Sequence, residues 1–231
     1  MKVSSIKLTH VLGLLSLIIL CLSTNGLLAQ TGPTASEVKS YSGLHLAAHT
    51  GNLSQIQELI SVGTPLEKQD SSGRTALHIA AFASHEEIIA ILAIAGANMN
   101  ALDHQAYDIV TIASVANDYE VLDVALNNGT SSSNVTSPYE GTALIAAAHL
   151  GHHKAVKRLI DAEAPLDHVN NLGWTALIEA VILGSGGSDH IETTRILVNA
   201  GASKTITDNQ DRTPLDLART LGYREIVSLL E

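Results

Sequence analysis

The chain has 231 residues, of which 13 are basic and 23 acidic, and its formal net charge is −10. An acidic surface repels phosphate backbones and anionic lipid headgroups, which argues against nucleic acid or a membrane surface as a partner. Aromatic side chains make up 3% of the residues, so alanine, leucine and isoleucine must form the core. The single cysteine, Cys21, permits neither a disulfide framework nor a cysteine-based metal site.

The N-terminal segment has the basic, apolar and polar regions of a secretory signal peptide, in that order. Lys2 and Lys7 precede an apolar run over residues 11–22, and a polar stretch then leads to a small residue, Ala29. The run is shorter than the roughly 20 residues that span a bilayer. We therefore expect residues 1–29 to be a signal peptide, cleaved after Ala29, that leaves a periplasmic or secreted chain without a membrane insertion. An uncleaved anchor is the alternative.

Export changes the composition of the mature chain. Cys21 is removed with the signal, and the large Leu20 before it argues against a lipoprotein signal, which has a small residue there. Loss of Lys2 and Lys7 leaves 11 of the 13 basic residues against 23 acidic ones, a formal net charge of −12. Because small secreted domains commonly rely on disulfides and this one has none, stacked apolar helices must hold it together.

A short motif recurs along the rest of the chain. It is clearest at Thr75-Ala76-Leu77-His78 and returns about every 33 residues. The first positions of its six copies are spaced 33, 33, 34, 33 and 38 residues apart, and they are Ser42, Thr75, Asp108, Thr142, Thr175 and Thr213. The last interval contains a glycine- and serine-rich insertion over residues 185–189, which we expect to be a flexible turn; a loop that contacts a partner is the alternative. A fixed period of this length predicts stacked copies of one supersecondary unit.

Each copy is predicted to contain a helix, a tight turn, a second helix and a hairpin. In the second copy the helices are expected over residues 76–83 and 86–95, where apolar residues follow the spacing of one helix face. Gly96 then stands where the chain must adopt a left-handed conformation. Glu163 occupies the same place in the fourth copy, and we expect this to cost about 1 kcal/mol.

The third copy departs most from the repeated pattern. Asp108 replaces the motif threonine, Val110 replaces the leucine, and Ala106 replaces the glycine of the hairpin. The stability of a repeat array is roughly a sum of unit and interface contributions. We therefore expect the third copy to have the lowest local stability.

The period and the Thr-x-Leu-His motif resemble the ankyrin repeat over residues 42–231. The resemblance implies an all-α solenoid of about six helix-turn-helix units joined by hairpin loops, preceded by a lead-in over residues 30–41 with a short helix at 35–39. It implies that His45 and His78 make structural hydrogen bonds. It also implies a module that binds another protein through its concave face and needs no cofactor.

Motifs of catalysis are missing from the sequence. It contains no Gly-x-Ser-x-Gly elbow and no phosphate-binding glycine loop. We predict a non-catalytic, monomeric protein–protein interaction module of the cell envelope. The alternative is a metal-binding or enzyme-accessory protein that uses His149, His152 and His153. However, His152 lies in the turn between the paired helices, and the two other imidazoles are fewer than the three or four ligands that a stable zinc site needs.

In ankyrin-like units the residues after the Ala-Ala pair and beside the hairpin glycine line the concave groove. The predicted partner-binding residues are Phe82, Tyr107, Val115, Tyr139, His149, Leu150, Trp174 and Ile182. Apolar and aromatic side chains at solvent-facing positions are typical of a contact patch. Trp174 is the strongest candidate, because a hairpin tip offers little core to bury an indole. Glu179, in an otherwise apolar helix, is expected to reach solvent or to cap a neighbouring loop.

Overall fold

The structure is a computed structural model that describes residues 31–231. The residues from Pro33 to Glu231 form one compact unit. The predicted signal peptide, its cleavage after Ala29 and Cys21 lie outside the described residues. Within residues 31–231, no helix combines the length and the apolar character that a membrane crossing requires.

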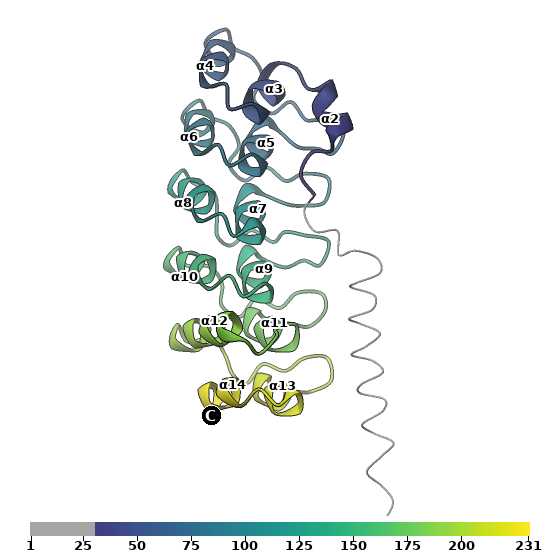
Figure 1. Ribbon diagram of the computed structural model, residues 1–231, viewed down its shortest axis with the longest axis vertical. Coiled ribbons are helices and arrows are strands. Elements are labelled where there is room, and N and C mark those ends of the chain that lie inside the picture. The colour runs from purple at the N-terminus through teal and green to yellow at the C-terminus, as the bar shows by residue number, and fades with distance from the viewer. Residues whose placement is uncertain (1–30) are drawn as a thin grey trace, which may run out of the picture. The chain divides into compact units, whose positions relative to one another are not determined.

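Six helix pairs follow one another along the compact unit, as the period predicts. The first helices of the pairs are α3 (Gly43–His49), α5 (Ala76–Phe82), α7 (Ile109–Ala116), α9 (Ala143–His149), α11 (Ala176–Ile182) and α13 (Pro214–Leu221). The second helices are α4 (Leu53–Ser61), α6 (Glu86–Ile94), α8 (Tyr119–Asn127), α10 (His153–Asp161), α12 (Ser188–Asn199) and α14 (Arg224–Leu230). Figure 1 shows two columns, in which each helix packs against its counterpart in the next pair. The predicted all-α solenoid is confirmed.

The first residue of the repeated motif begins the first helix of each pair. In the last four repeats its side chain accepts a backbone N–H that the first turn of the helix leaves unpaired, whereas Ser42 makes no such bond. In the fifth repeat, Thr175 Oγ1 accepts from Ile178 N at 3.2 Å. In the third repeat, Asp108 Oδ1 accepts from Thr111 N at 2.8 Å. The aspartate that replaces threonine there therefore preserves the helix cap.

The backbone is left-handed directly after the second helix of most pairs. Gly63, Gly96, Gly129 and Gly201 have φ angles between 74° and 97°, and Glu163 has a φ of 61°. The predicted exception in the fourth repeat is confirmed. A Cβ atom added to Gly96 would meet nothing within 4 Å. The cost at this position of the repeat therefore comes from the backbone conformation rather than from crowding.

Four of the five hairpin loops share one hydrogen-bond pattern. In the first, Asp70 N donates to Arg74 O at 2.9 Å, and Asp70 Oδ1 accepts from the backbone N–H groups of Ser72 and Arg74. This side-chain oxygen organises the tight turn. The same pattern recurs at Asp103, Asn170 and Asp208.

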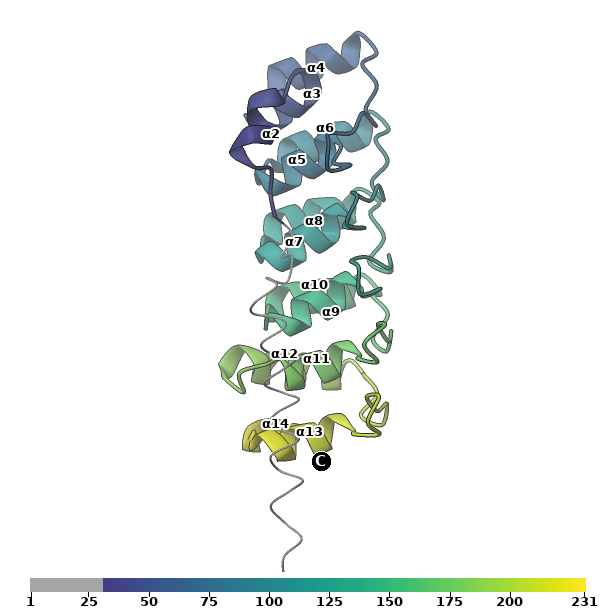
Figure 2. The same cartoon turned by 90° about the vertical axis from the view of Figure 1, so that its right-hand side faces the viewer.

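Neighbouring hairpins are tied to one another by backbone hydrogen bonds. His104 N donates to Ser72 O at 3.0 Å, and Asn171 N donates to Tyr139 O at 3.0 Å. Figure 2 shows the hairpins in a row along one side of the helix pairs. Side chains from adjacent repeats are thereby brought together along this row.

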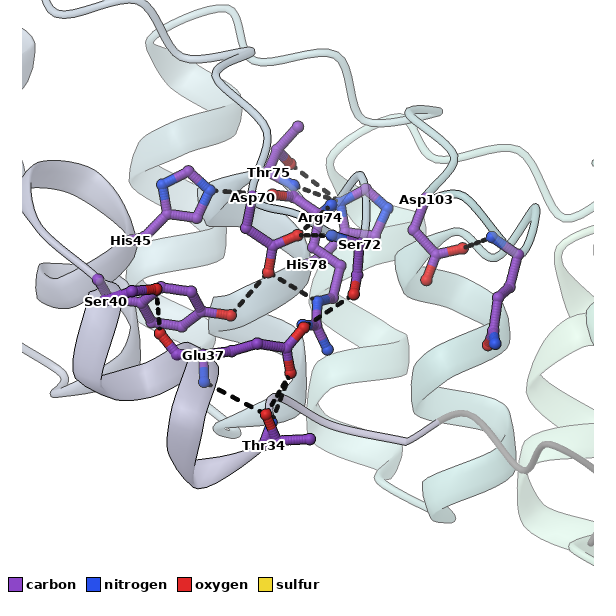
Figure 3. Close-up of polar contacts among 12 residues, drawn as sticks. Thr34, Glu37, Ser40, His45, Asp70, Ser72, Arg74, Thr75, His78 and Asp103 are labelled. Carbon is purple, nitrogen blue, oxygen red and sulfur yellow. Dashed lines mark hydrogen bonds and ion pairs between the residues drawn. The ribbon is translucent and has the colours of Figure 1, made fainter.

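A polar network fastens the lead-in helix α2 (Ala35–Ser40) to the first hairpin, as Figure 3 shows. Arg74, which is buried, pairs with both Glu37 and Asp70. Tyr41 Oη donates to Asp70 Oδ2 at 2.7 Å, and Ser72 Oγ donates to Glu37 Oε1 at 2.8 Å. Burial acts to raise the pKa of Asp70, but hydrogen bonds from Arg74, Tyr41 and Ser72 hold that pKa below its ordinary value. The predicted lead-in helix is confirmed.

The insertion over residues 185–189 is only partly a turn. Helix α12 begins inside it at Ser188 and, with 12 residues, is the longest helix in the described part of the chain. Gly186 lies so close to Tyr223 that an added Cβ would stand 2.5 Å from the ring. Tyr223 Oη also donates to Gly184 O at 2.9 Å. The expectation of a flexible turn is therefore wrong, because the insertion forms part of the contact between the last two repeats.

Candidate protein-binding surface

The two motif histidines connect helices α3 and α5 to the hairpins that follow them. Thr75 N donates to His78 Nδ1 at 3.2 Å, so the other ring nitrogen, Nε2, donates to Tyr107 O at 3.2 Å. His45 Nε2 makes the equivalent bond to Arg74 O at 2.9 Å. Burial lowers the pKa of His78, which favours its neutral form. The predicted structural role of both imidazoles is confirmed.

The three histidines of the metal-binding alternative do not converge. His149 Nδ1 lies 3.0 Å from Glu179 Oε2, and His152 Nδ1 lies 2.9 Å from Ser114 O. His153 Nδ1 is 3.7 Å from a carboxylate of α12. Among residues 31–231, no group of three or more histidine, cysteine, aspartate or glutamate side chains is arranged to hold a metal ion. The geometry therefore gives no support to the metal-binding alternative.

Three of the predicted partner-binding side chains are buried. Trp174 is 7% exposed, and Tyr107 and Ile182 are each 8% exposed. Trp174 does not lie at a hairpin tip: its backbone closes the turn with Asn170, and it directly precedes the helix-capping Thr175. Side chains at this place in the repeat are covered by the surrounding structure. The expectation of an exposed indole is wrong, and these three residues offer little surface to a partner.

The other predicted contact residues remain accessible. Leu150 is 40% exposed and Tyr139 is 37% exposed, while Phe82, Val115 and His149 are partly exposed. Phe82, Val115 and His149 occupy corresponding places in the first helices of three consecutive repeats. We call these five residues the groove set. They form a candidate contact surface across the second, third and fourth repeats.

Three hairpins carry an exposed apolar side chain at the same place, which the sequence analysis did not identify. Leu102, Val135 and Val169 are 40%, 49% and 45% exposed. Each stands directly before the residue that opens the hairpin turn of its repeat. The first and last hairpins carry the polar Gln69 and Thr207 in this place. Aligning the hairpins as carefully as the helices would have revealed these side chains.

Glu179 forms a buried polar cluster with His149 of the groove set. It is 5% exposed, so the expectation that it reaches solvent is wrong. Its Oε1 accepts from Asn170 Nδ2 at 2.9 Å, and its Oε2 lies 3.0 Å from His149 Nδ1. Because Asn170 belongs to the hairpin, the expectation that Glu179 caps a neighbouring loop is confirmed. Three residues that are 9 and 30 positions apart in the sequence thus meet.

Comparison with known proteins identifies the family. A family model described as ankyrin repeats, in three copies, matches residues 15–103 and 110–208. The chain belongs to the ankyrin repeat family. The putative ankyrin repeat protein YahD of Escherichia coli (strain K12) is 31% identical over 186 residues, which are 80% of this chain and 92% of YahD.

Solved structures of other ankyrin repeat proteins have the same fold. An ankyrin repeat domain from Acinetobacter baumannii AYE is 40% identical, with a TM-score of 0.77 over 81% of this chain and 95% of that one. The ankyrin repeat protein EF0377 is 32% identical, with a TM-score of 0.77 over 82% of this chain and 98% of that one. Ankyrin repeat domains generally mediate contacts between proteins, and members of the family are typically interaction modules without catalytic activity.

Proposed function

We propose that this ankyrin repeat protein is a non-catalytic interaction module of the cell envelope that binds a partner protein through its concave face. The observation that carries the proposal is the groove set, a series of accessible apolar and aromatic side chains in consecutive repeats. Fold membership supplies the general class of function, whereas the binding surface must be argued from the side chains themselves.

The distribution of the groove set supports a localised contact. The second and third repeats carry Phe82 and Val115 at one position of the first helix, where the first and last repeats carry His49 and Thr220. Leu150 caps the C-terminus of α9 and is 40% exposed. Apolar side chains that stay accessible on a monomer commonly mark a contact surface, and aromatic residues are enriched among binding hot spots. The middle of the stack is therefore the proposed contact region.

Photo-crosslinking tests the binding surface in the native cell. A photoreactive amino acid at position 150 should capture a partner that mass spectrometry identifies, and the purified partner then permits affinity measurements. Leu150→Glu should weaken binding by about tenfold or more, since it places a charge in a desolvated contact. Ile94→Glu is the matched control, because Ile94 is apolar, 83% exposed and lies on the second helix of its pair. Equal effects of the two substitutions would refute the groove assignment.

Location in the envelope is a separate part of the proposal. It rests on the charged, apolar and polar zones of residues 1–29. Cell fractionation followed by N-terminal sequencing tests it. The expected product is an envelope or secreted protein that begins at Gln30. A full-length chain confined to the cytosol would contradict export without affecting the assignment of the groove.

A further inference from the structure

Glu179 breaks the repeated pattern of the first helices. All five equivalent residues are apolar: Ile79, Ile112 and Leu217 are at most 2% exposed, Ala146 is partly exposed, and Leu46 is 36% exposed. A carboxylate buried at such a place is costly unless it is paired and hydrogen bonded. Stacking the repeats does not require it, since the other repeats stack with an aliphatic side chain. Departures of this kind from an otherwise consistent pattern concentrate at functional sites.

Asn170 also differs from most residues that open a hairpin turn, and the difference allows it to hydrogen bond with Glu179. Three of the other four hairpins open with Asp70, Asp103 and Asp208, and the fourth opens with Thr136. Asn170 Oδ1 accepts the backbone N–H groups of the turn, as those aspartates do, and its amide Nδ2 is then free to donate to Glu179. An aspartate here would place two carboxylates against each other. The asparagine thus keeps the turn and also donates a hydrogen bond to Glu179.

The carboxylate determines how His149 presents its ring. Because Glu179 Oε2 accepts, His149 Nδ1 must carry the hydrogen of this 3.0 Å bond. In the neutral imidazole, Nε2 is then an acceptor. Nε2 has no hydrogen-bond partner among residues 31–231, and the side chain is 25% exposed. His149 therefore presents Nε2 as a hydrogen-bond acceptor, and its ring is held in place by the Glu179 carboxylate on the opposite side.

The charge around this acceptor favours a cation. The Glu179–His149 pair with a neutral imidazole carries one negative charge, and no lysine or arginine in the described part of the chain pairs with either residue. Partial burial strengthens attraction between opposite charges.

We infer that His149 Nε2 and Glu179 form a binding site for a lysine or arginine side chain of the partner protein. The ammonium or guanidinium N–H donates to Nε2, while the Glu179 carboxylate behind the ring supplies the attraction. Leu150, exposed beside His149, contacts the aliphatic part of the basic side chain. This inference rests on the proposed function, because it names the chemistry of the group that the groove binds.

Side-chain analogues test the site even before the partner is identified. Protein labelled with 15N-histidine is titrated with N-acetylarginine amide, N-acetyllysine amide and N-acetylglutamate amide, and the His149 ring resonances are followed. The basic analogues should shift the Nε2 resonance in a saturable way, and the acidic analogue should not. Glu179→Gln should weaken binding of the arginine analogue about tenfold. Glu87→Gln, an exposed charge change on α6, should leave it unchanged. Equal shifts with acidic and basic analogues would overturn the inference.

A second variant separates binding from a purely structural role. Glu179→Leu restores the aliphatic residue of the other repeats, so the midpoint of urea unfolding should stay the same or rise while binding of the arginine analogue is lost. A lowered midpoint with unchanged binding would show that the cluster is structural and would overturn the inference. If crosslinking from position 150 captures a partner but the arginine analogue leaves His149 unshifted, the proposed function stands and only the basic-side-chain site fails.

Discussion

Glu163 offers a direct measurement of backbone strain in a repeat. Its φ of 61° is a conformation that costs a residue with a side chain about 1–2 kcal/mol. Glycine removes that cost, but its greater freedom in the unfolded chain gives back about 0.4–1 kcal/mol. Through the backbone alone, Glu163→Gly should therefore raise the free energy of unfolding by about 0.5–1 kcal/mol. Four other repeats already have glycine here, and an added Cβ at Gly96 meets no atom within 4 Å.

Two further variants isolate the backbone contribution. Glu163 also places a negative charge near the C-terminus of α10, which is unfavourable by about 0.3–1 kcal/mol. Glu163→Gln removes that charge and keeps a side chain of similar size. The free energy of unfolding of the glycine variant minus that of the glutamine variant therefore measures the backbone strain. Gly96→Ala should lower the free energy of unfolding by about 1 kcal/mol. Urea unfolding monitored by circular dichroism provides all three values. A glycine variant no more stable than the glutamine variant would refute the reasoning.

Three other substitutions have expected outcomes. Ala106→Gly should stabilise the third repeat by about 0.5–1 kcal/mol, because Ala106 has a φ of 61°; hydrogen exchange that is not slowed in α7 would contradict this. Burial lowers the pKa of His78, so the unfolded chain takes up a proton at a higher pH than the folded protein. The stability that the neutral His78 contributes is complete above about pH 6.5 and declines as the pH falls. In His78→Gln, the urea midpoint should therefore fall less between neutral and acidic pH than in the natural protein. An identical pH dependence of the two midpoints would contradict this prediction. Trp174→Ala should lower the free energy of unfolding by about 3–5 kcal/mol, because the indole is buried; a change below about 1 kcal/mol would show that the indole contributes little to the core.

The repeat period predicts most of the fold because the same local features begin and end the helices in each repeat. The threonine positions begin helices, and the residue after the second helix is left-handed even where Glu163 replaces glycine. These features depend on neighbours within a few residues of the chain. They can therefore be inferred from sequence without knowing how the repeats pack.

The candidate site was less predictable because burial depends on the adjacent repeats. Trp174 stands only three residues beyond the hairpin tip at Asn171, yet the surrounding structure covers it. The cluster of Glu179, Asn170 and His149 joins two repeats, and Glu179 and Asn170 differ from the residues at their places in the other repeats. Its spacing carries no periodic signal, so the contact becomes visible only when the repeats are stacked.

Hydrogen exchange of the protein with its captured partner tests the central claim most directly. The amides of the protein are compared with and without the partner, whose identity comes from crosslinking. Binding through the concave face predicts slower exchange at the C-terminal ends of α5, α7 and α9 and in the hairpins between them. Exchange in α6, α8 and α10 should change little. Protection concentrated on these second helices, with the first helices and hairpins unaffected, would contradict the account.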